Sequence, residues 1–60
     1  MKVLIVEDED ATRFVMAGAV KSRGHEVKSA RDGLQGLQLF KEFQPDIVIS
    51  DINMPEMDGL

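Results

Sequence analysis

Two short apolar runs that each lead into acidic residues restrict the fold of this sequence more than any other feature. Val3–Val6 is a continuous aliphatic run, and four acids from Glu7 to Asp10 follow it. Ile47–Ser50 is a second such run, and it ends at Asp51. Continuous aliphatic runs of this length are typical of parallel strands that are buried on both faces. We therefore predict two buried strands whose carboxyl ends lead into carboxylates.

The segment after the first acids has the pattern of an amphipathic helix. Its apolar and small residues recur at helical spacing, as a stripe of the kind that packs on a core. The members of this stripe are Ala11, Phe14, Val15, Gly18 and Ala19. We expect Asp10 to cap the N-terminus of this helix and Gly24 to follow its C-terminus.

A weaker strand and a second helix are predicted next. Glu26–Ala30 has little alternation, which suggests a strand at the edge of a sheet. The helix should run from about Leu34 to Phe43, with Asp32 as its cap and Pro45 as its stop. Gly36 inside it costs about 1 kcal/mol relative to Ala, so tertiary packing must hold this helix. The buried face is expected to consist of Leu34, Leu37, Phe40 and the stem of Lys41.

The order strand, helix, strand, helix, strand describes a βαβαβ unit of an α/β fold. Short connections and right-handed crossovers make the strands parallel, with helices covering the faces of the sheet. If the sheet is doubly wound with the flavodoxin-like order 2-1-3, the first strand lies between the second and the third. The first and third strands are then about 4.8 Å apart, which brings Asp8 close to Asp51. Ligands bind beyond the carboxyl ends of such strands.

Carboxylates that converge at one edge of a sheet repel each other, and a divalent cation relieves that repulsion. Mg²⁺ prefers oxygen ligands and commonly takes one or two carboxylates together with a phosphate oxygen. We therefore predict a Mg²⁺ site that includes Glu7, Asp8 and Asp51. An Asp carboxylate beside such an ion can act as a nucleophile and form an aspartyl phosphate.

The residues of this site also carry a resemblance to a known family. Val3–Glu9 and Asp51–Gly59 resemble the two N-terminal signatures of response-regulator receiver domains, and Ala30–Gly33 fits the same pattern. The most specific part of the resemblance is the motif D-x-x-M-P-x-M-D-G at Asp51–Gly59, combined with the acidic pair Glu7-Asp8 after the first strand. The resemblance covers all 60 residues. It implies a CheY-like fold, of which residues 1–60 would be a partial receiver domain truncated at the start of the third helix.

The resemblance implies a role for each matched residue. Asp51 would accept a phosphoryl group from a histidine kinase or a phosphotransfer protein of a two-component phosphorelay. Asp8 would bind Mg²⁺ directly, Glu7 would act on it mostly through water, and Asn53 would offer its backbone carbonyl. The protein would be a cytoplasmic switch, not an enzyme that acts on a separate metabolite. The family's Ser or Thr after the fourth strand and its Lys after the fifth lie outside these 60 residues, so we expect poor phosphorylation of the isolated chain.

Charge and hydropathy exclude other classes of function. The net charge is −4 and no basic stripe occurs, which argues against direct nucleic-acid binding. No apolar run approaches the ~20 residues that span a bilayer. His25 is expected in a surface loop without a phosphotransfer role. The remaining alternative is a degenerate receiver fragment that acts as an interaction module. Whatever the function, we expect Ile47–Ser50 to be an exposed apolar edge, so that the 60-residue chain pairs with a second copy of itself or folds poorly.

Overall fold

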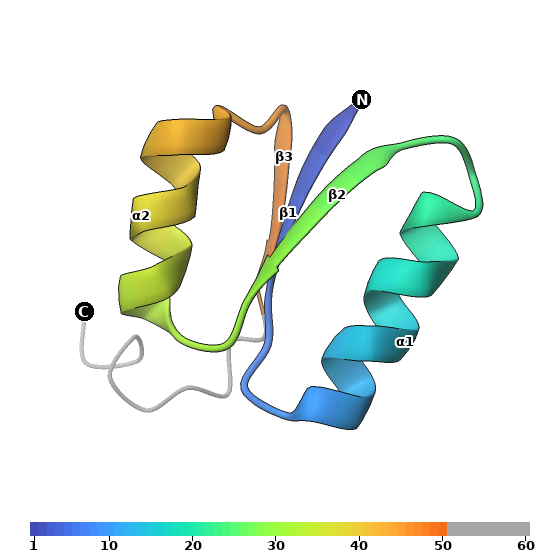
Figure 1. The fold of residues 1–60 in the computed structure, drawn as a ribbon, viewed down its shortest axis with the longest axis horizontal. Coiled ribbons are helices and arrows are strands. Elements are labelled where there is room, and N and C mark those ends of the chain that lie inside the picture. Colours follow the sequence, from blue (N-terminus) through green and yellow to red (C-terminus); the bar gives the residue numbers. More distant parts are fainter. Residues whose placement is uncertain (51–60) are drawn as a thin grey trace.

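The computed structural model describes residues 1–50, so Asp51 and Asn53 of the predicted site lie outside the described residues. Strands and helices alternate along the described part of the chain (Figure 1). The elements are β1 (Lys2–Val6), α1 (Asp10–Lys21), β2 (Glu26–Ala30), α2 (Gly33–Phe43) and β3 (Ile47–Ser50). Neither helix is long and apolar enough to cross a membrane within this part of the chain.

The three strands form one parallel sheet in the order β2-β1-β3. Val6 at the end of β1 lies opposite Ala30 on one side and Ser50 on the other. The carboxyl ends of all three strands therefore meet at one edge of the sheet. The predicted α/β class, the parallel strands, the order 2-1-3 and the edge position of β2 are all confirmed.

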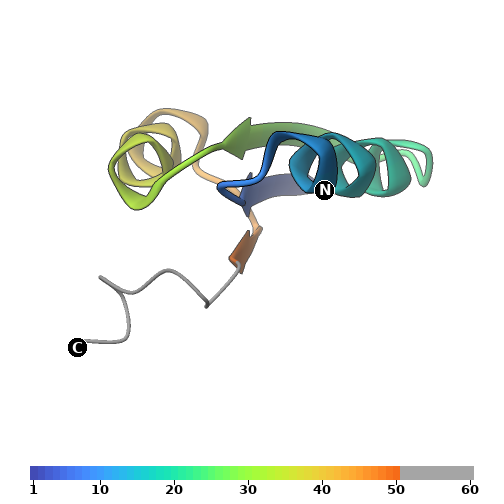
Figure 2. The ribbon, with the colours of Figure 1, turned by 90° about the horizontal axis from the view of Figure 1, so that it is seen from below.

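The two helices lie on opposite sides of the sheet, as the views in Figure 1 and Figure 2 both show. β1 is the centre of the core, since Leu4 and Ile5 are fully buried there. Side chains alternate along a strand, so neighbouring residues of β1 serve opposite faces. Leu4 and Val6 cluster with Ala30 and are packed by Leu39 of α2. Both faces of β1 are thus covered, which is why its sequence is apolar without alternation.

The apolar stripe predicted for α1 is not the face that this helix buries. Phe14 of the stripe is 81% exposed and Val15 is also exposed. The partly buried residues of α1 are Thr12, Arg13, Met16, Ala17 and Val20. Among the described elements, α1 contacts β1 and β2 but not β3. The position of α1 over those two strands turns the neighbouring face of the helix, not the predicted stripe, towards the sheet.

The buried face predicted for α2 is also wrong. Leu34 is 81% exposed, and Leu37 and Phe40 are each about half exposed. The buried residues of α2 are instead Gly36 and Phe43, with Leu39 partly buried between them. A Cβ on Gly36 would come within 2.9 Å of the Val6 side chain, so the helix approaches β1 along this face.

The N-cap predicted for α2 is confirmed, whereas the N-cap predicted for α1 is wrong. Asp32 caps α2 as predicted, since its Oδ1 accepts a hydrogen bond of 2.8 Å from the Gln35 backbone N–H. Glu9, not Asp10, occupies the N-cap position of α1, and its side chain makes no capping hydrogen bond. Asp10 is the first helical residue and its carboxylate pairs with Arg13. Gly24 follows α1 with a φ of +89°, a conformation that favours glycine.

Candidate site at the carboxyl edge of the sheet

Glu7 directly follows β1 and lies at the edge where the three strands end. Its backbone N–H donates a hydrogen bond of 2.9 Å to the carbonyl of Ala30, which ties the end of β1 to the end of β2. The residue is only 4% exposed, and no other buried polar or charged residue occurs in the described range. Its Oε2 accepts a hydrogen bond of 3.0 Å from the Glu9 backbone N–H. Glu7 is therefore held at the base of the turn that leads into α1.

Asp8, the second predicted ligand, differs from Glu7 in its surroundings. It is exposed. Its side chain has no hydrogen-bond or ion-pair partner within residues 1–50, where every other acid of the turn makes such a contact. The carboxylate of Asp8 is thus accessible to a ligand from solution, whereas Glu7 is buried. The roles expected for the two residues, a direct ligand and a ligand that acts through water, remain predictions.

The third predicted carboxylate, Asp51, is reached through β3. Ser50 is the last described residue and lies opposite Val6 of β1. Glu7 follows Val6 in the sequence, and Asp51 follows Ser50. The structure therefore brings the end of β3 beside Glu7 and Asp8, whereas Asp51 and Asn53 remain predictions. No group of three or more acidic, His or Cys side chains suited to a metal ion occurs in residues 1–50.

Two carboxylates at this edge fit a Mg²⁺ ion by their chemistry. Mg²⁺ takes few protein carboxylates and retains water at its other positions. Glu7 and Asp8 supply oxygen atoms only, and no Cys occurs anywhere in the sequence to favour a softer metal. The donor set on the described side of the site is that of a hard, hydrated cation.

Arg13 belongs to this site, although the sequence analysis did not identify it. Its Nη1 donates a hydrogen bond of 2.9 Å to the backbone carbonyl of Glu7. Its Nη2 contacts the carboxylate of Asp10, one turn earlier in α1. The spacing of Asp10 and Arg13 is a recognisable helical pair in the sequence. The contact with a main-chain oxygen has no sequence signal, because every residue carries such an oxygen.

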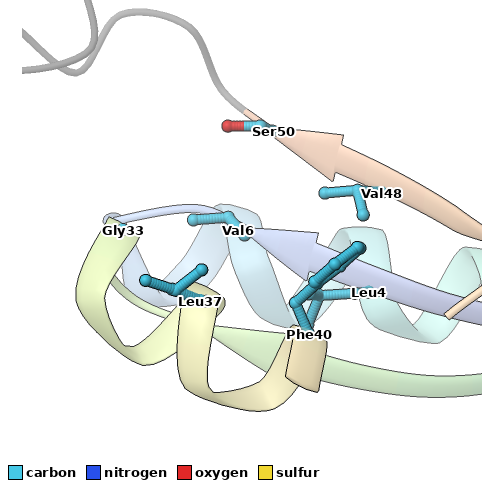
Figure 3. Close-up of a pocket in the computed structure, with 8 residues that line it drawn as sticks. Leu4, Val6, Gly33, Leu37, Phe40, Val48 and Ser50 are labelled. Atoms are coloured by element: carbon cyan, nitrogen blue, oxygen red, sulfur yellow. The ribbon is translucent and has the colours of Figure 1, made fainter. Parts of the chain in front are cut away.

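An apolar hollow adjoins the acidic edge on the side of α2 (Figure 3). Its volume is about 230 Å³. Its lining includes Leu4, Val6, Leu37, Phe40, Val48 and Ser50. The Oγ of Ser50 is buried there and has no hydrogen-bond partner among the described residues. The lining carries no charged group, so this hollow does not extend the acidic site.

His25 lies at the opposite edge of the sheet, where the strands begin. Its Nδ1 is 3.2 Å from the amino nitrogen of Met1. Glu26 next to it donates a backbone hydrogen bond to the Met1 carbonyl. Because the strands are parallel, this end is the one farthest from Glu7 and Asp8. The structure keeps His25 away from the candidate site, and its side chain is partly buried rather than fully exposed.

Comparison with known proteins identifies similar sequences along nearly the whole chain. The family model described as the response regulator receiver domain matches residues 3–60. Regulatory protein AtoC of Escherichia coli is 44% identical over 98% of the chain, which covers 13% of that relative. Sensor kinase CckA of Brucella abortus is 49% identical over 95% of the chain and 6% of its own length. A probable chemotaxis protein CheY of Rhizobium etli is 43% identical over the whole chain and 47% of its own length. The chain thus spans less than half of each of these relatives.

Proposed function

Because the chain belongs to the response regulator receiver domain family of two-component signalling, we propose that Asp51 is its phospho-acceptor. The main support for this proposal is the register of the sheet. The parallel pairing of β1 with β3 sets Ser50, which precedes Asp51 in the sequence, opposite Val6, which precedes Glu7 and Asp8. An acceptor carboxylate at position 51 would then follow a strand that ends beside two further carboxylates.

The donor in this proposal is a histidine kinase or a phosphotransfer protein. Relatives of the chain include proteins named as sensor kinases, and others named as regulators. In the transfer step a carboxylate oxygen of Asp51 forms the new O–P bond. The bond between phosphorus and the donor's histidine nitrogen breaks, and that nitrogen keeps the electron pair. The acceptor contributes a positioned nucleophile, and the step has a loose transition state.

A Mg²⁺ ion is the proposed cofactor. It would neutralise the charge of the phosphoryl oxygens. Asp8 would bind the ion directly, since its carboxylate is exposed and unpaired among residues 1–50. Glu7 would act through water from its buried position. Asp51 and the backbone carbonyl of Asn53 complete the proposed ligand set.

The proposed role is that of a cytoplasmic switch that takes part in its own phosphorylation and dephosphorylation and then acts on an output. Direct binding of nucleic acid by this segment is not part of the proposal, because its net charge is −4.

The test is the chemistry of the phosphate formed on the full-length protein. We expect incubation with a phosphorylated histidine kinase and Mg²⁺ to give an acid-stable phosphate that hydroxylamine removes. Asp51→Asn should abolish this phosphate. Asp32→Asn is the matched control, because asparagine keeps the cap of α2 and the same charge is lost. A hydroxylamine-labile phosphate that persists in the Asp51→Asn variant would remove Asp51 from the acceptor role.

A second candidate function is self-association through β3. The side chains of Ile47, Val48 and Ile49 are all more than a third exposed, and β3 pairs only with β1 within the described part of the chain. An apolar strand with a free edge is a template for pairing with another chain. In this proposal the 60-residue chain pairs with a second copy of itself.

Sedimentation equilibrium distinguishes this candidate from the first. We expect the isolated chain to form dimers that Val48→Lys weakens. Leu34→Lys on α2 is the control, since Leu34 is more exposed than Val48 but lies away from the strand edge. A chain that stays monomeric over a wide range of concentrations would rule out the second candidate and leave the first intact.

A further inference from the structure

The turn between β1 and α1 is held by hydrogen bonds on either side of Asp8. On the strand side, Glu7 is tied to β2 through the carbonyl of Ala30. On the helix side, the carbonyl of Glu9 accepts a hydrogen bond of 2.9 Å from the Arg13 backbone N–H. The Glu7 carboxylate closes the turn by accepting from the Glu9 N–H. The conformation of Asp8 is therefore set by the hydrogen bonds of its neighbours, since its own side chain makes no hydrogen bond or ion pair within residues 1–50.

The side chain of Arg13 joins the two sides of this turn. One nitrogen of its guanidinium donates to the carbonyl of Glu7, at the end of β1. The other contacts Asp10, the first residue of α1. The side chain is only 20% exposed, whereas that of Asp10 is 87% exposed. The guanidinium thus bridges Glu7, which precedes Asp8, and Asp10, which follows it.

We infer that Arg13 is a positioning residue, whose guanidinium fixes the turn so that the Asp8 carboxylate is presented as a metal ligand. This inference rests on the proposed function, because it concerns the Mg²⁺ site of that proposal. Arg13 acts through the main chain of Glu7 and does not bind the ion itself. A guanidinium suits this role because its planar fork can donate in two fixed directions at once. The single ammonium of a lysine cannot reproduce both contacts in the same geometry.

The sign of the effect on metal affinity separates positioning from simple charge. A positive charge beside a cation site repels the cation, so loss of that charge alone would strengthen Mg²⁺ binding. Loss of a group that orients a ligand weakens binding instead, typically by about 10- to 100-fold. Arg13→Gln removes both the charge and the fork, whereas Arg13→Lys keeps the charge and removes the fork. Positioning predicts weaker binding in both variants, whereas charge alone predicts tighter binding in the first and no change in the second.

The experiment is a calorimetric titration of the full chain with MgCl₂. We expect a roughly tenfold or greater loss of affinity for both Arg13 variants. Arg23→Gln is the matched control, because this exposed arginine lies beyond the C-terminus of α1 and loses the same charge. Unchanged affinity in Arg13→Lys, or tighter binding in Arg13→Gln, would overturn the inference. Loss of the fold in Arg13→Lys but not in Arg23→Gln, seen by circular dichroism, would also overturn it, since Arg13 would then be a stabilising residue.

A second readout follows the turn without any metal. Backbone ¹⁵N relaxation of Asp8 and Glu9 should report larger rapid motion in both Arg13 variants, while the amides of β1 stay unchanged. If the unmodified chain does not respond to Mg²⁺ and the turn still loosens in the variants, the proposed Mg²⁺ site fails, and Arg13 holds the turn without presenting a metal ligand. If the unmodified chain binds Mg²⁺ and the turn is equally rigid in all variants, only the inference about Arg13 is wrong.

Discussion

Gly36 of α2 lies so close to Val6 of β1 that a Cβ at position 36 would stand 2.9 Å from Val6 Cγ2. The same Cβ would be 3.8 Å from the Cβ of Ala30 on β2. Real Cβ contacts are not that short, so the helix could not keep this distance from the sheet with any larger residue. Gly36 lowers the helix propensity of α2. Its lack of a side chain nevertheless allows α2 to cover the end of β1. That end carries Glu7 and Asp8.

Gly36→Ala should therefore destabilise the fold even though alanine favours a helix. A methyl group forced into so close a contact costs about 1–3 kcal/mol, against a gain of about 1 kcal/mol in helix propensity. The branched Val6 side chain is stiff and can move little to accept the methyl group. Equilibrium unfolding in urea measures the net effect. Gly18→Ala is the control, because nothing lies within 4 Å of a Cβ there, and it should stabilise the chain. A stabilised Gly36→Ala variant would show that α2 has room to move away from β1.

Asp32→Ala should lower the free energy of unfolding by about 1 kcal/mol, because it removes the cap of α2. The lost contact is the 2.8 Å hydrogen bond from the Gln35 N–H to Asp32 Oδ1. Asp32→Asn keeps an acceptor at the same place and should remain close to the unmodified stability. Thermal unfolding of the two variants side by side makes the comparison. Equal losses in both would mean that charge near the helix N-terminus matters more than the hydrogen bond.

Asp8→Asn should weaken Mg²⁺ binding by an order of magnitude or more, because it removes the charge of the exposed carboxylate at the site. Glu42→Gln removes the same charge from the far end of α2 and should leave the affinity nearly unchanged, since distant surface charges are screened by salt. Calorimetric titration with MgCl₂ at a fixed ionic strength provides the measurement. Equal affinities for Asp8→Asn and the unmodified chain would place the metal elsewhere.

Ser50→Ala should stabilise the fold, by about 1 kcal/mol, because a buried hydroxyl without a partner costs free energy. The Oγ of Ser50 is buried at the end of β3 with no hydrogen bond among the described residues. Ser22→Ala is the opposite case, since the Ser22 Oγ donates a hydrogen bond of 2.8 Å to the Ala19 carbonyl. In urea unfolding, Ser50→Ala should be more stable than the unmodified chain and Ser22→Ala should be less stable. A destabilised Ser50→Ala variant would indicate that the hydroxyl has a partner in the folded protein.

The sequence by itself determined the elements, their order and the parallel sheet. These properties depend on local patterns: the aliphatic runs of β1 and β3, the cap at Asp32, and the glycine and proline residues that end the helices. The family resemblance added the order of the strands and an expected role for each residue of the acidic site. The position of Glu7 and Asp8 at the carboxyl edge could be predicted because they directly follow a buried strand, and the end of such a strand has a known place in this type of fold. Their role as metal ligands stays a prediction.

Only the tertiary structure decided which face of each helix is buried and what holds the acidic turn. Both helices carry apolar side chains over a wide arc, and periodicity alone cannot choose between neighbouring faces of that arc. In α2 the choice is made by the close approach of Gly36 to Val6, a contact between residues far apart in the sequence. The turn is held by the hydrogen bond from Arg13 to the main-chain oxygen of Glu7. A pattern of side chains in the sequence cannot predict this bond, because every residue has such an oxygen. Both decisions depend on distances in space, which the order of residues does not contain.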